Sequence, residues 1–327
     1  MITCRVTTES WQFIEPFGIA RLVATDQHLI HVALTDLQGR TGQAEAAGVD
    51  YDGETTMSMI EQVRAFEPRF SEPLDPETLQ KLLPKGGARN AIDCALWDLR
   101  AKQTGVPVWQ AAGLAAPRPL ITAYTLGLGT PIETRRKARE ATGYPLLKLK
   151  VDAQRHIDVV TIVREEQPNA RLIVDANQSW SVELLKELLP PLAAAGVELI
   201  EQPVARGADA ALAGLNSPIP IAADESCMDR SSLAGLVGRY QYVNIKLDKC
   251  GGFTEALALA NEAERLGFGL MVGNMCGTSL GMAPAFLIGQ RCRYVDLDGP
   301  LLQRADRDVP MIFEGAVIHG PLPALWG

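Results

Sequence analysis

The sequence predicts an α/β fold: a (β/α)8-type barrel, that is a modified TIM barrel, preceded by an N-terminal α+β capping domain. The first observation is a repeat between residues 119 and 299, where eight short apolar segments are each followed by a helical stretch. The polar residues that end these segments stand 22 to 28 residues apart. Eight β-then-α units of nearly constant length are typical of a closed parallel barrel. The second observation is the different pattern of the first third, which is β-rich and then helical.

The N-terminal third begins with three β-rich runs separated by turn residues, at 4–11, 28–35 and 41–48. The helical patterns that follow lie at 54–66, 76–83 and 88–104. The last of these carries apolar residues at helical spacing and stops before Gly105 and Pro107. Strands followed by helices predict a small α+β module.

The eight barrel strands are predicted at 120–126, 146–151, 171–176, 197–203, 220–226, 242–247, 269–274 and 293–299. Each ends in a polar residue, and in chain order these are Thr125, Lys150, Asp175, Glu201, Asp224, Lys246, Asn274 and Asp296. Side chains at the C-terminal ends of barrel strands meet at one mouth, where barrel enzymes place their active sites. A doubly wound open sheet is the alternative, but no glycine-rich phosphate loop follows the first strand.

Three consecutive strands end in the carboxylates Asp175, Glu201 and Asp224. Neighbouring strands lie about 5 Å apart, so these side chains can surround one ion. Oxygen ligands without histidine or cysteine suit a hard cation, which predicts Mg2+ with Mn2+ as an alternative. Asn177 is expected to orient one of the ligands. The competing interpretation is that each carboxylate only caps the helix after its strand.

Lysines flank the carboxylates on both sides. Lys148 and Lys150 stand two residues apart on one strand and so face the same way, whereas Lys246 ends a strand across the barrel. A substrate between Lys150 and Lys246 would meet an amine on each face, which suits removal of a proton from a stereocentre and its return on the other side. The alternative is that the lysines are counter-ions to the carboxylates.

Composition narrows the class of function. The net charge of −8 argues against a nucleic-acid partner. No apolar run approaches the roughly 20 residues that span a bilayer, and neither membrane attachment nor a signal peptide is expected. Six cysteines without CxxC or zinc-like spacing predict reduced thiols in a cytoplasmic protein. The four histidines stand in unrelated contexts, so lysines and carboxylates are the expected acid and base.

Five motifs together resemble the muconate-lactonizing subgroup of the enolase superfamily. They are KLK at 148–150, VDAN at 174–177, EQP at 201–203, ADES at 223–226 and NIKLDKCGG at 244–252. The resemblance covers essentially the whole chain. It implies a capping domain at 1–115, a barrel at 116–300 and a C-terminal segment at 301–327 that returns to the cap.

A sixth motif, DLDG at 296–299, is similar to that of the L-Ala-D/L-Glu (dipeptide) epimerases. In that group a D-x-D pair on the eighth strand holds the α-ammonium of the dipeptide, which assigns Asp296 and Asp298 to substrate binding. The resemblance implies further substrate contacts from Thr125, Lys148 and Asn274.

Cap loops near 17–21 and 49–53 are expected to close over the substrate and to set the preference for its side chain. Arg21, in the first of them, either pairs with a glutamate side chain of the substrate or is an exposed surface arginine.

The expected function is Mg2+-dependent epimerisation of L-Ala-L/D-Glu or related L-Ala-X dipeptides. The reaction is a two-base 1,1-proton transfer through an enediolate, and its expected role is the reuse of cell-wall peptides. Alternatives on the same scaffold are N-acylamino acid racemase, o-succinylbenzoate synthase and muconate cycloisomerase. A catalytically silent barrel is a third interpretation. The only expected partner is the small-molecule dipeptide, and a homo-oligomer stays open.

Overall fold

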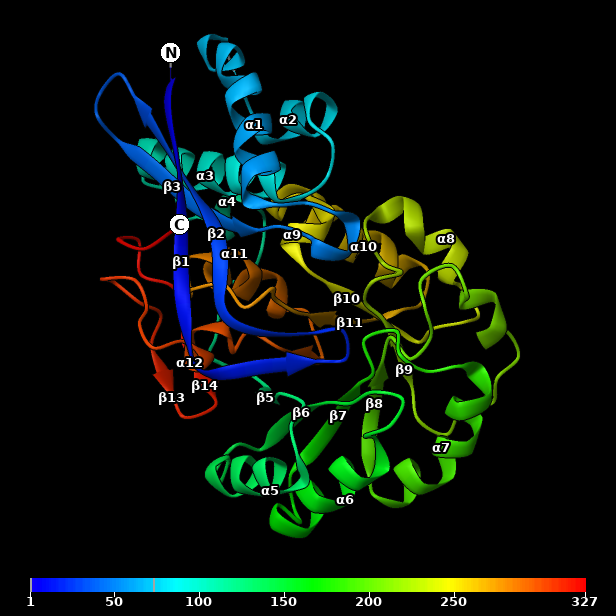
Figure 1. The fold of residues 1–327 in the computed structure, drawn as a ribbon. Helices are drawn as coiled ribbons and strands as arrows, with labels where there is room; N and C mark the ends of the chain where they lie inside the picture. Colours follow the sequence, from blue (N-terminus) through cyan, green and yellow to red (C-terminus); the bar gives the residue numbers. More distant parts are fainter. Residues whose placement is uncertain (1, 73) are drawn as a thin grey trace.

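The computed structural model describes residues 2–72 and 74–327. Figure 1 shows two parts: a sheet with helices above it, built from the N-terminal third, and a ring of strands surrounded by helices, built from the rest. The cap lies against the barrel, and its β1–β2 hairpin reaches down across the strands. The predicted fold class, a modified TIM barrel with an N-terminal cap, is confirmed.

The cap contains a three-stranded antiparallel sheet in the order β1-β2-β3. Its strands are β1 (Ile2–Ile19), β2 (Leu22–Asp36) and β3 (Thr41–Ala47). Its helices are α1 (Thr56–Phe66), α2 (Pro76–Leu82), α3 (Gly87–Thr104) and α4 (Val108–Ala111), with 3-10 turns η1 (Asp50–Asp52) and η2 (Glu67–Ser71). Each predicted strand and helix of the cap overlaps one of these elements.

Local sequence explains where the cap helices begin and end. Helix α1 starts at a capping box in which the side chains of Thr55 and Ser58 bond each other's backbone N–H groups. Helix α2 starts after Asp75, whose side chain accepts a hydrogen bond from the Thr78 N–H at 2.7 Å. Helix α3 ends at Gly105, which has a φ of 71°, a left-handed conformation that costs glycine little.

The barrel sheet has eight parallel strands in sequence order. They are β5 (Tyr124–Leu126), β6 (Leu146–Lys150), β7 (Arg171–Asp175), β8 (Val197–Glu201), β9 (Ile221–Ala223), β10 (Tyr242–Ile245), β11 (Gly269–Val272) and β12 (Tyr294–Val295). Each falls within a predicted strand. The ring closes through a backbone hydrogen bond of 2.7 Å from the Ala123 N–H, beside β5, to the Val295 carbonyl on β12.

The helices outside the sheet differ in length around the ring. They are α5 (Pro131–Glu140), α6 (Ile157–Glu166), α7 (Val182–Ala194), α8 (Leu233–Leu236), α9 (Leu247–Cys250), α10 (Phe253–Arg265), α11 (Ser279–Gly289) and α12 (Gly299–Leu302). Between β8 and β9 there is only the 3-10 turn η3 (Asp209–Leu212), and η4 (Arg230–Ser232) precedes α8. The expectation of a helical stretch after every strand is therefore wrong after β8, where Pro203, Gly207, Gly214 and Pro218 interrupt a helix.

The predicted first strand, 120–126, is two strands in the structure. Its first part, β4 (Leu120–Ile121), pairs with the C-terminal hairpin of β13 (Phe313–Glu314) and β14 (Val317–Ile318) instead of joining the barrel. Thr122 stands at the break, where its hydroxyl accepts a hydrogen bond from the Leu297 N–H at 2.8 Å. Only the second part, β5, contributes to the mouth.

The C-terminal segment contacts the cap. The Trp326 indole N–H donates to the Cys94 carbonyl at 2.9 Å, and the Gly327 N–H donates to Asp98 at 2.9 Å. The carbonyl of Leu325 accepts a hydrogen bond from the Gln43 side chain at 3.0 Å. The predicted boundaries near residues 115 and 300 stay predictions.

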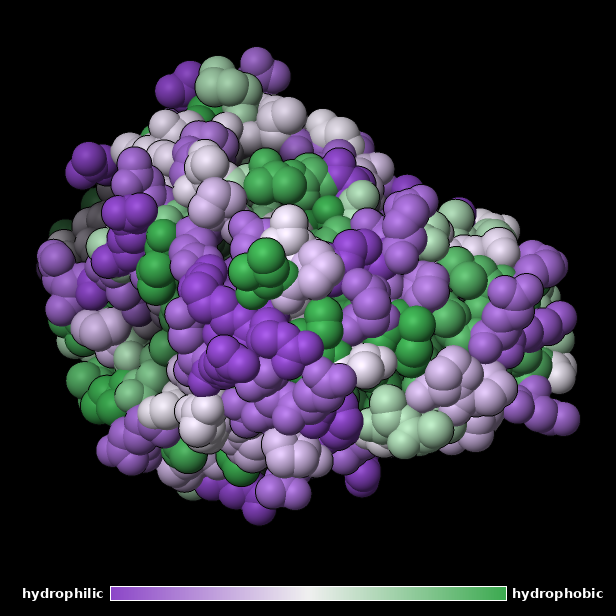
Figure 2. Space-filling model, turned by 60° about the horizontal axis from the view of Figure 1, so that its bottom comes forward, coloured by the Kyte–Doolittle hydropathy of each residue, from purple (hydrophilic) through white to green (hydrophobic). Residues whose placement is uncertain are grey.

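The apolar core has two layers. An inner cluster fills the barrel with side chains that lie on or directly beside its strands: Ala123, Leu146, Ile173, Leu199, Ala222, Met271 and Tyr294. A larger cluster lies between the strands and the outer helices and continues into the cap. Across residues 2–72 and 74–327 no helix is both long enough and apolar enough to cross a bilayer, and the face in Figure 2 mixes polar with scattered apolar side chains.

Candidate active site

The strand ends meet at the mouth of the barrel beneath the cap. In the sheet register Lys150 pairs with Asp175, and Asp175 pairs with Glu201, so their side chains stand in one row. A cavity of about 380 Å3 opens at this mouth. The cap residues that line it include Phe17, Ile19, Arg21, Asp50 and Tyr51, and the barrel residues are Lys150, Asn177, Asp224, Glu225, Lys246, Asn274, Met275 and Cys276.

The ammonium of Lys148 lies among three carboxylates. Its Nζ is 2.8 Å from Glu201 Oε2, 2.8 Å from Asp296 Oδ2 and 3.1 Å from Asp175 Oδ2. Burial opposes the charge of this lysine, but the three carboxylates outweigh burial and raise the pKa of Lys148 well above its usual value. Lys148 is therefore the positive centre that holds these acids together.

Lys150 and Lys246 each bind a different carboxylate of the predicted metal set. Lys150 Nζ donates to Asp175 Oδ2 at 2.7 Å and to Asn177 Oδ1 at 3.2 Å. Lys246 Nζ donates to Asp224 Oδ2 at 2.7 Å. Lys150 ends β6 and Lys246 follows β10, so the strands β7, β8 and β9 separate them. The two amines approach the cavity from opposite sides of the carboxylate-bearing strands.

The three predicted metal ligands are buried, and their protonation differs. Burial alone would raise the pKa of Asp175, but Lys150 and Lys148 lower it to about 2. Burial likewise opposes ionisation of Asp224, and Lys246 and Lys249 lower its pKa well below the usual range. Burial and the nearby Asp175 raise the pKa of Glu201 to about 8. Glu201 is the acid of this set that most lacks positive charge.

The donor set suits a hard cation. In the described parts of the chain no three histidine, cysteine or acidic side chains converge in a metal-binding arrangement, because the carboxylates turn to lysines instead. Glu201 Oε2 is buried without an aligned hydrogen-bond donor among these residues, although Lys148 lies nearby. Three buried carboxylates with one unsatisfied oxygen fit a divalent ion, which takes oxygen ligands.

The predicted ammonium ligands Asp296 and Asp298 are not among the residues that line the cavity. The Thr125 N–H donates to Asp298 Oδ2 at 2.6 Å, and the Thr125 hydroxyl donates to Asp296 Oδ1 at 3.4 Å. The Asn274 amide donates to the Asp296 carbonyl at 2.7 Å. Burial and the neighbouring Asp296 raise the pKa of Asp298 to about 7. All five predicted substrate contacts, Lys148 included, therefore gather around Asp296.

Arg21 lies over the cavity and is not an isolated surface arginine. Its guanidinium binds Asp50 through two hydrogen bonds of 3.1 and 3.0 Å and lies 3.6 Å from Glu225 Oε1. Its side chain is 30% exposed. Pairing with a substrate side chain stays a prediction, although the position of Arg21 permits it.

Two buried residues of the site were given no role from the sequence. Lys249 donates to Asp224 Oδ1 at 2.5 Å and to the Asn244 carbonyl at 3.0 Å. The Asn244 amide donates to Glu201 Oε1 at 2.8 Å. Both lie in the motif that contains Lys246, and Asn244 stands two residues before it on the same strand face. That alternation is a signal for Asn244, whereas Lys249 lies on a helix where no strand pattern applies.

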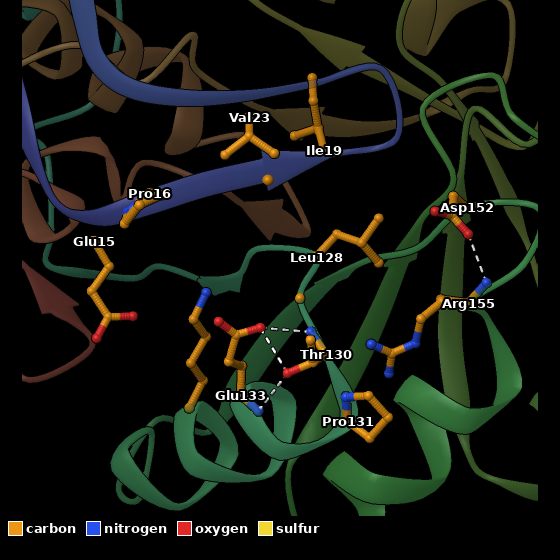
Figure 3. Close-up of a pocket in the computed structure, with 13 residues that line it drawn as sticks. Glu15, Pro16, Ile19, Val23, Leu128, Thr130, Pro131, Glu133, Asp152 and Arg155 are labelled. Carbon is orange, nitrogen blue, oxygen red and sulfur yellow. Dashed lines mark hydrogen bonds between the residues drawn. The ribbon is translucent and has the colours of Figure 1, made fainter.

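A second hollow of about 550 Å3 lies between the β1–β2 hairpin and the loops that follow β5 and β6 (Figure 3). Its lining includes Ile19, Val23, Leu128, Thr130, Glu133 and Arg155, and it contains none of the predicted site residues. The Glu133 carboxylate accepts hydrogen bonds from the Thr130 N–H and hydroxyl and so caps α5. Glu133 and Thr130 in this hollow are therefore committed to local structure.

Two family models match the chain. The N-terminal domain of mandelate racemase / muconate lactonizing enzyme matches residues 1–113, and the model described as enolase C-terminal domain-like matches residues 132–318. The chain is 40% identical to the L-Ala-D/L-Glu epimerase of Escherichia coli (strain K12) over 321 residues, which are 98% of this chain and 100% of that protein. It is 41% identical to the N-acetyl-D-glutamate racemase of Pseudoalteromonas sp over 288 residues, 88% of this chain and 91% of that protein.

Solved structures of similar fold agree with these family matches. An enolase family member from Agrobacterium tumefaciens with homology to dipeptide epimerases, with bound sodium and L-Ala-L-Glu, has a TM-score of 0.98 at 41% identity and 100% coverage of both chains. The dipeptide epimerase of Enterococcus faecalis V583, complexed with Mg and L-Leu-L-Tyr, has a TM-score of 0.91 at 28% identity and 99% coverage of both. The chain therefore belongs to the enolase superfamily, in the mandelate racemase and muconate-lactonizing group, and is an isomerase of that superfamily.

Proposed function

We propose that the chain is a Mg2+-dependent epimerase of L-Ala-L/D-Glu and related L-Ala-X dipeptides that works by two-base 1,1-proton transfer. One observation carries the proposal: Lys150 and Lys246 face the same cavity from opposite sides of three carboxylate-bearing strands. Relatives named as dipeptide epimerases support the substrate class.

The dipeptide is oriented by its two charged ends. Its α-ammonium would bind Asp296 and Asp298, whose oxygens Thr125 already holds through its N–H and hydroxyl. Two carboxylates facing one cation make a strong, charge-assisted contact. Asp175, Glu201 and Asp224 would hold Mg2+, with Mn2+ as the alternative. When bound there, the cation supplies a Lewis acid that stabilises negative charge on the substrate carboxylate.

The two lysines move the protons. A neutral lysine on one side takes the α-proton of the second residue, and the ammonium on the other side returns a proton to the opposite face, which inverts the stereocentre. In the reverse direction the two lysines exchange roles. Carbonyl-adjacent protons are weakly acidic, so both amines need direct access to the α-carbon, and both line the cavity.

Arg21 favours an acidic second residue. Its guanidinium lines the cavity at the tip of the β1–β2 hairpin, where the carboxylate of a substrate glutamate would meet its positive charge beside Asp50. We therefore include L-Ala-L/D-Glu first among the proposed substrates.

The test is solvent exchange. The protein is incubated with L-Ala-L-Glu and Mg2+ in deuterated water, and mass spectrometry and chiral separation follow the product. The proposal expects one deuterium at the α-carbon of the second residue, together with the L-Ala-D-Glu epimer. A substrate recovered without deuterium and without inversion would refute it.

A racemase of N-acylamino acids is the second candidate, because the chain is also 41% identical to an N-acetyl-D-glutamate racemase. Such a substrate has no α-ammonium. The double substitution Asp296→Asn and Asp298→Asn decides between the two. If the chain is a dipeptide epimerase, the double variant should lose turnover of L-Ala-L-Glu. If the chain is an N-acylamino acid racemase, the double variant should turn over N-acetylglutamate nearly as fast as the wild type. No comparable observation favours o-succinylbenzoate synthesis or muconate lactonisation.

We also propose a cytoplasmic location and a role in the reuse of cell-wall peptides. All six cysteines, at positions 4, 94, 227, 250, 276 and 292, are free thiols, as a reducing compartment favours. The reuse of cell-wall peptides would supply L-Ala-Glu dipeptides as the substrate. Growth on L-Ala-D-Glu, with and without the gene, tests the role.

A further inference from the structure

The cap loop over the cavity contains a three-residue turn, Asp50–Tyr51–Asp52, that is η1 in the structure. Its own backbone bonds are few: the Asp52 N–H donates to the Val49 carbonyl at 3.0 Å, and the Gly53 N–H donates to the Asp50 carbonyl at 2.9 Å. A turn this short has little intrinsic stability, so side chains from elsewhere decide its position.

Two arginines from distant parts of the chain hold this turn. Arg21, at the tip of the β1–β2 hairpin, binds Asp50, and Arg206, in the barrel loop after β8, binds Asp52. Both guanidinium groups also stack on the ring of Tyr51, at 5.2 Å for Arg21 and 5.6 Å for Arg206. Two cations over one tyrosine ring, each also paired with an aspartate beside that tyrosine, restrict the position of the ring.

The hydroxyl of Tyr51 is left without a partner. Its Oη is buried and forms no hydrogen bond with any residue in 2–72 or 74–327, and the same holds for Glu225 Oε2. Both residues line the active-site cavity. Burial raises the pKa of Tyr51, and Asp224 and Glu225 raise it further, so the hydroxyl stays protonated and remains a donor. A buried donor without an acceptor is costly unless a ligand supplies one.

We propose that Tyr51 determines specificity: its hydroxyl donates a hydrogen bond to an acceptor oxygen at the end of the substrate's second side chain. Arg21 and Arg206 hold the ring in the lining of the cavity. The inference rests on the proposed dipeptide epimerisation and extends it. A side chain that ends in a carboxylate or amide oxygen satisfies Tyr51, whereas an apolar side chain of similar length leaves the donor unpaired.

The first test is Tyr51→Phe, which removes the hydroxyl and keeps the ring. The ratio of kcat/KM for L-Ala-L-Glu to that for the similarly long L-Ala-L-Met should fall about ten-fold, as expected for loss of a hydrogen bond to a charged acceptor. L-Ala-L-Gln should lose activity in the same direction, and L-Ala-L-Met should change little. An unaltered ratio in Tyr51→Phe overturns the proposal.

The second test is Arg206→Ala, which should release the turn without touching the substrate. Hydrogen exchange of the amides in 50–54, measured without substrate, should become faster, and KM for L-Ala-L-Glu should rise more than kcat falls. Arg171→Ala is the matched control, because Arg171 is 41% exposed against 40% for Arg206. It too pairs with a carboxylate, Glu198, and stacks on a tyrosine, but at the opposite end of the barrel.

The outcomes separate the two proposals. Wild-type protein that epimerises no dipeptide refutes the proposed function, and the exchange measurement then still decides whether Arg206 holds the turn. Equal exchange in Arg206→Ala and Arg171→Ala overturns the assigned role of Arg206 even if the wild type epimerises dipeptides.

Discussion

Two lysine side chains carry the proposed chemistry, and each should be indispensable. Lys150→Ala and Lys246→Ala each remove one of the two proton-transfer groups that face the cavity. Epimerisation should fall by about 10^2- to 10^4-fold or more in each, since positioned acid–base groups contribute at that scale. Kinetics with both epimers measure this, and the exposed Lys186→Ala serves as the control. Substantial epimerisation by either single variant would contradict the two-base mechanism.

Asp298 should determine how kcat/KM for L-Ala-L-Glu falls at acidic pH. Burial and Asp296 raise its pKa to about 7, so in the free protein it becomes neutral below pH 7. A neutral carboxyl does not attract an ammonium, and the dipeptide amine stays charged throughout pH 5 to 7. The value of kcat/KM for L-Ala-L-Glu should therefore fall as the pH drops below 7. A profile that stays flat between pH 5 and 7 would argue against Asp298 as the ammonium ligand.

At the residue scale the sequence located much of the site. The alternation of strand residues and the polar strand ends predicted that Lys150, Asp175 and Glu201 stand in one row, which the sheet register confirms. Their roles stay predictions. Tyr51 and Lys249 carry no such signal, since one lies in a cap loop and the other on a helix. Only folding brings Tyr51 to the cavity and Lys249 to Asp224.

At the element scale, helix α9 joins the lysine-bearing strand to the cap. Its Asp248 accepts hydrogen bonds from the Ala47 N–H on β3 at 3.0 Å and from the Asn90 side chain on α3 at 2.9 Å. Burial raises the pKa of Asp248 to about 7. The folded protein therefore binds the proton of the Asp248 carboxyl more tightly than the unfolded chain does, where the pKa is about 3.9. The free energy of unfolding consequently decreases as the pH rises from 4 to 7.

Asp248→Asn should remove this pH dependence while keeping both hydrogen bonds, because both donors use the same oxygen of Asp248. The free energy of unfolding of the variant relative to wild type should increase between pH 5 and pH 8. Denaturant unfolding at the two pH values measures it. The reverse trend would show that Asp248 is ionised in the folded protein.

The C-terminal segment should contribute strongly to stability through one side chain. Trp326 is 1% exposed, donates to the Cys94 carbonyl on α3 and packs edge-on against Phe253. Trp326→Ala should lower the free energy of unfolding by about 3–5 kcal/mol, as large buried aromatic truncations do. Trp326→Phe keeps most of the packing and should cost less. A loss below about 1 kcal/mol in Trp326→Ala would mean that the segment is not anchored there.

Elements were predicted well where periodicity alone decides them. Alternation and helical spacing located the three cap strands, the cap helices α1, α2 and α3, and all eight barrel strands, but not the short helix α4. They did not separate β4 from β5, because no glycine or proline divides 120–126 and only the C-terminal hairpin selects β4 as its partner. The β8–β9 connection departs from the repeat because Pro203, Gly207, Gly214 and Pro218 interrupt a helix there, which the spacing of the strand ends does not reveal.

For the whole molecule, metal binding should couple to stability. Asp175, Glu201 and Asp224 are buried, and Glu201 keeps an unsatisfied oxygen. Mg2+ at 100 times its dissociation constant should add about 2.7 kcal/mol to the free energy of unfolding. Thermal unfolding with EDTA and then with added Mg2+ measures this change in stability. Activity should likewise be lost with EDTA and recovered with Mg2+. Glu201→Gln should weaken both effects, and an identical response in that variant would refute Glu201 as a ligand.

The sequence by itself determined the repeat of eight strands, the α+β cap and the residues that end each strand, because hydrophobic periodicity and turn residues are local properties of the chain. The tertiary structure decided which loop covers the mouth, which lysine meets which carboxylate and how Arg21 and Arg206 contact Tyr51. These contacts join segments up to 155 residues apart, from position 51 to 206. No local pattern records them, since they exist only once the barrel has closed and the cap has packed upon it.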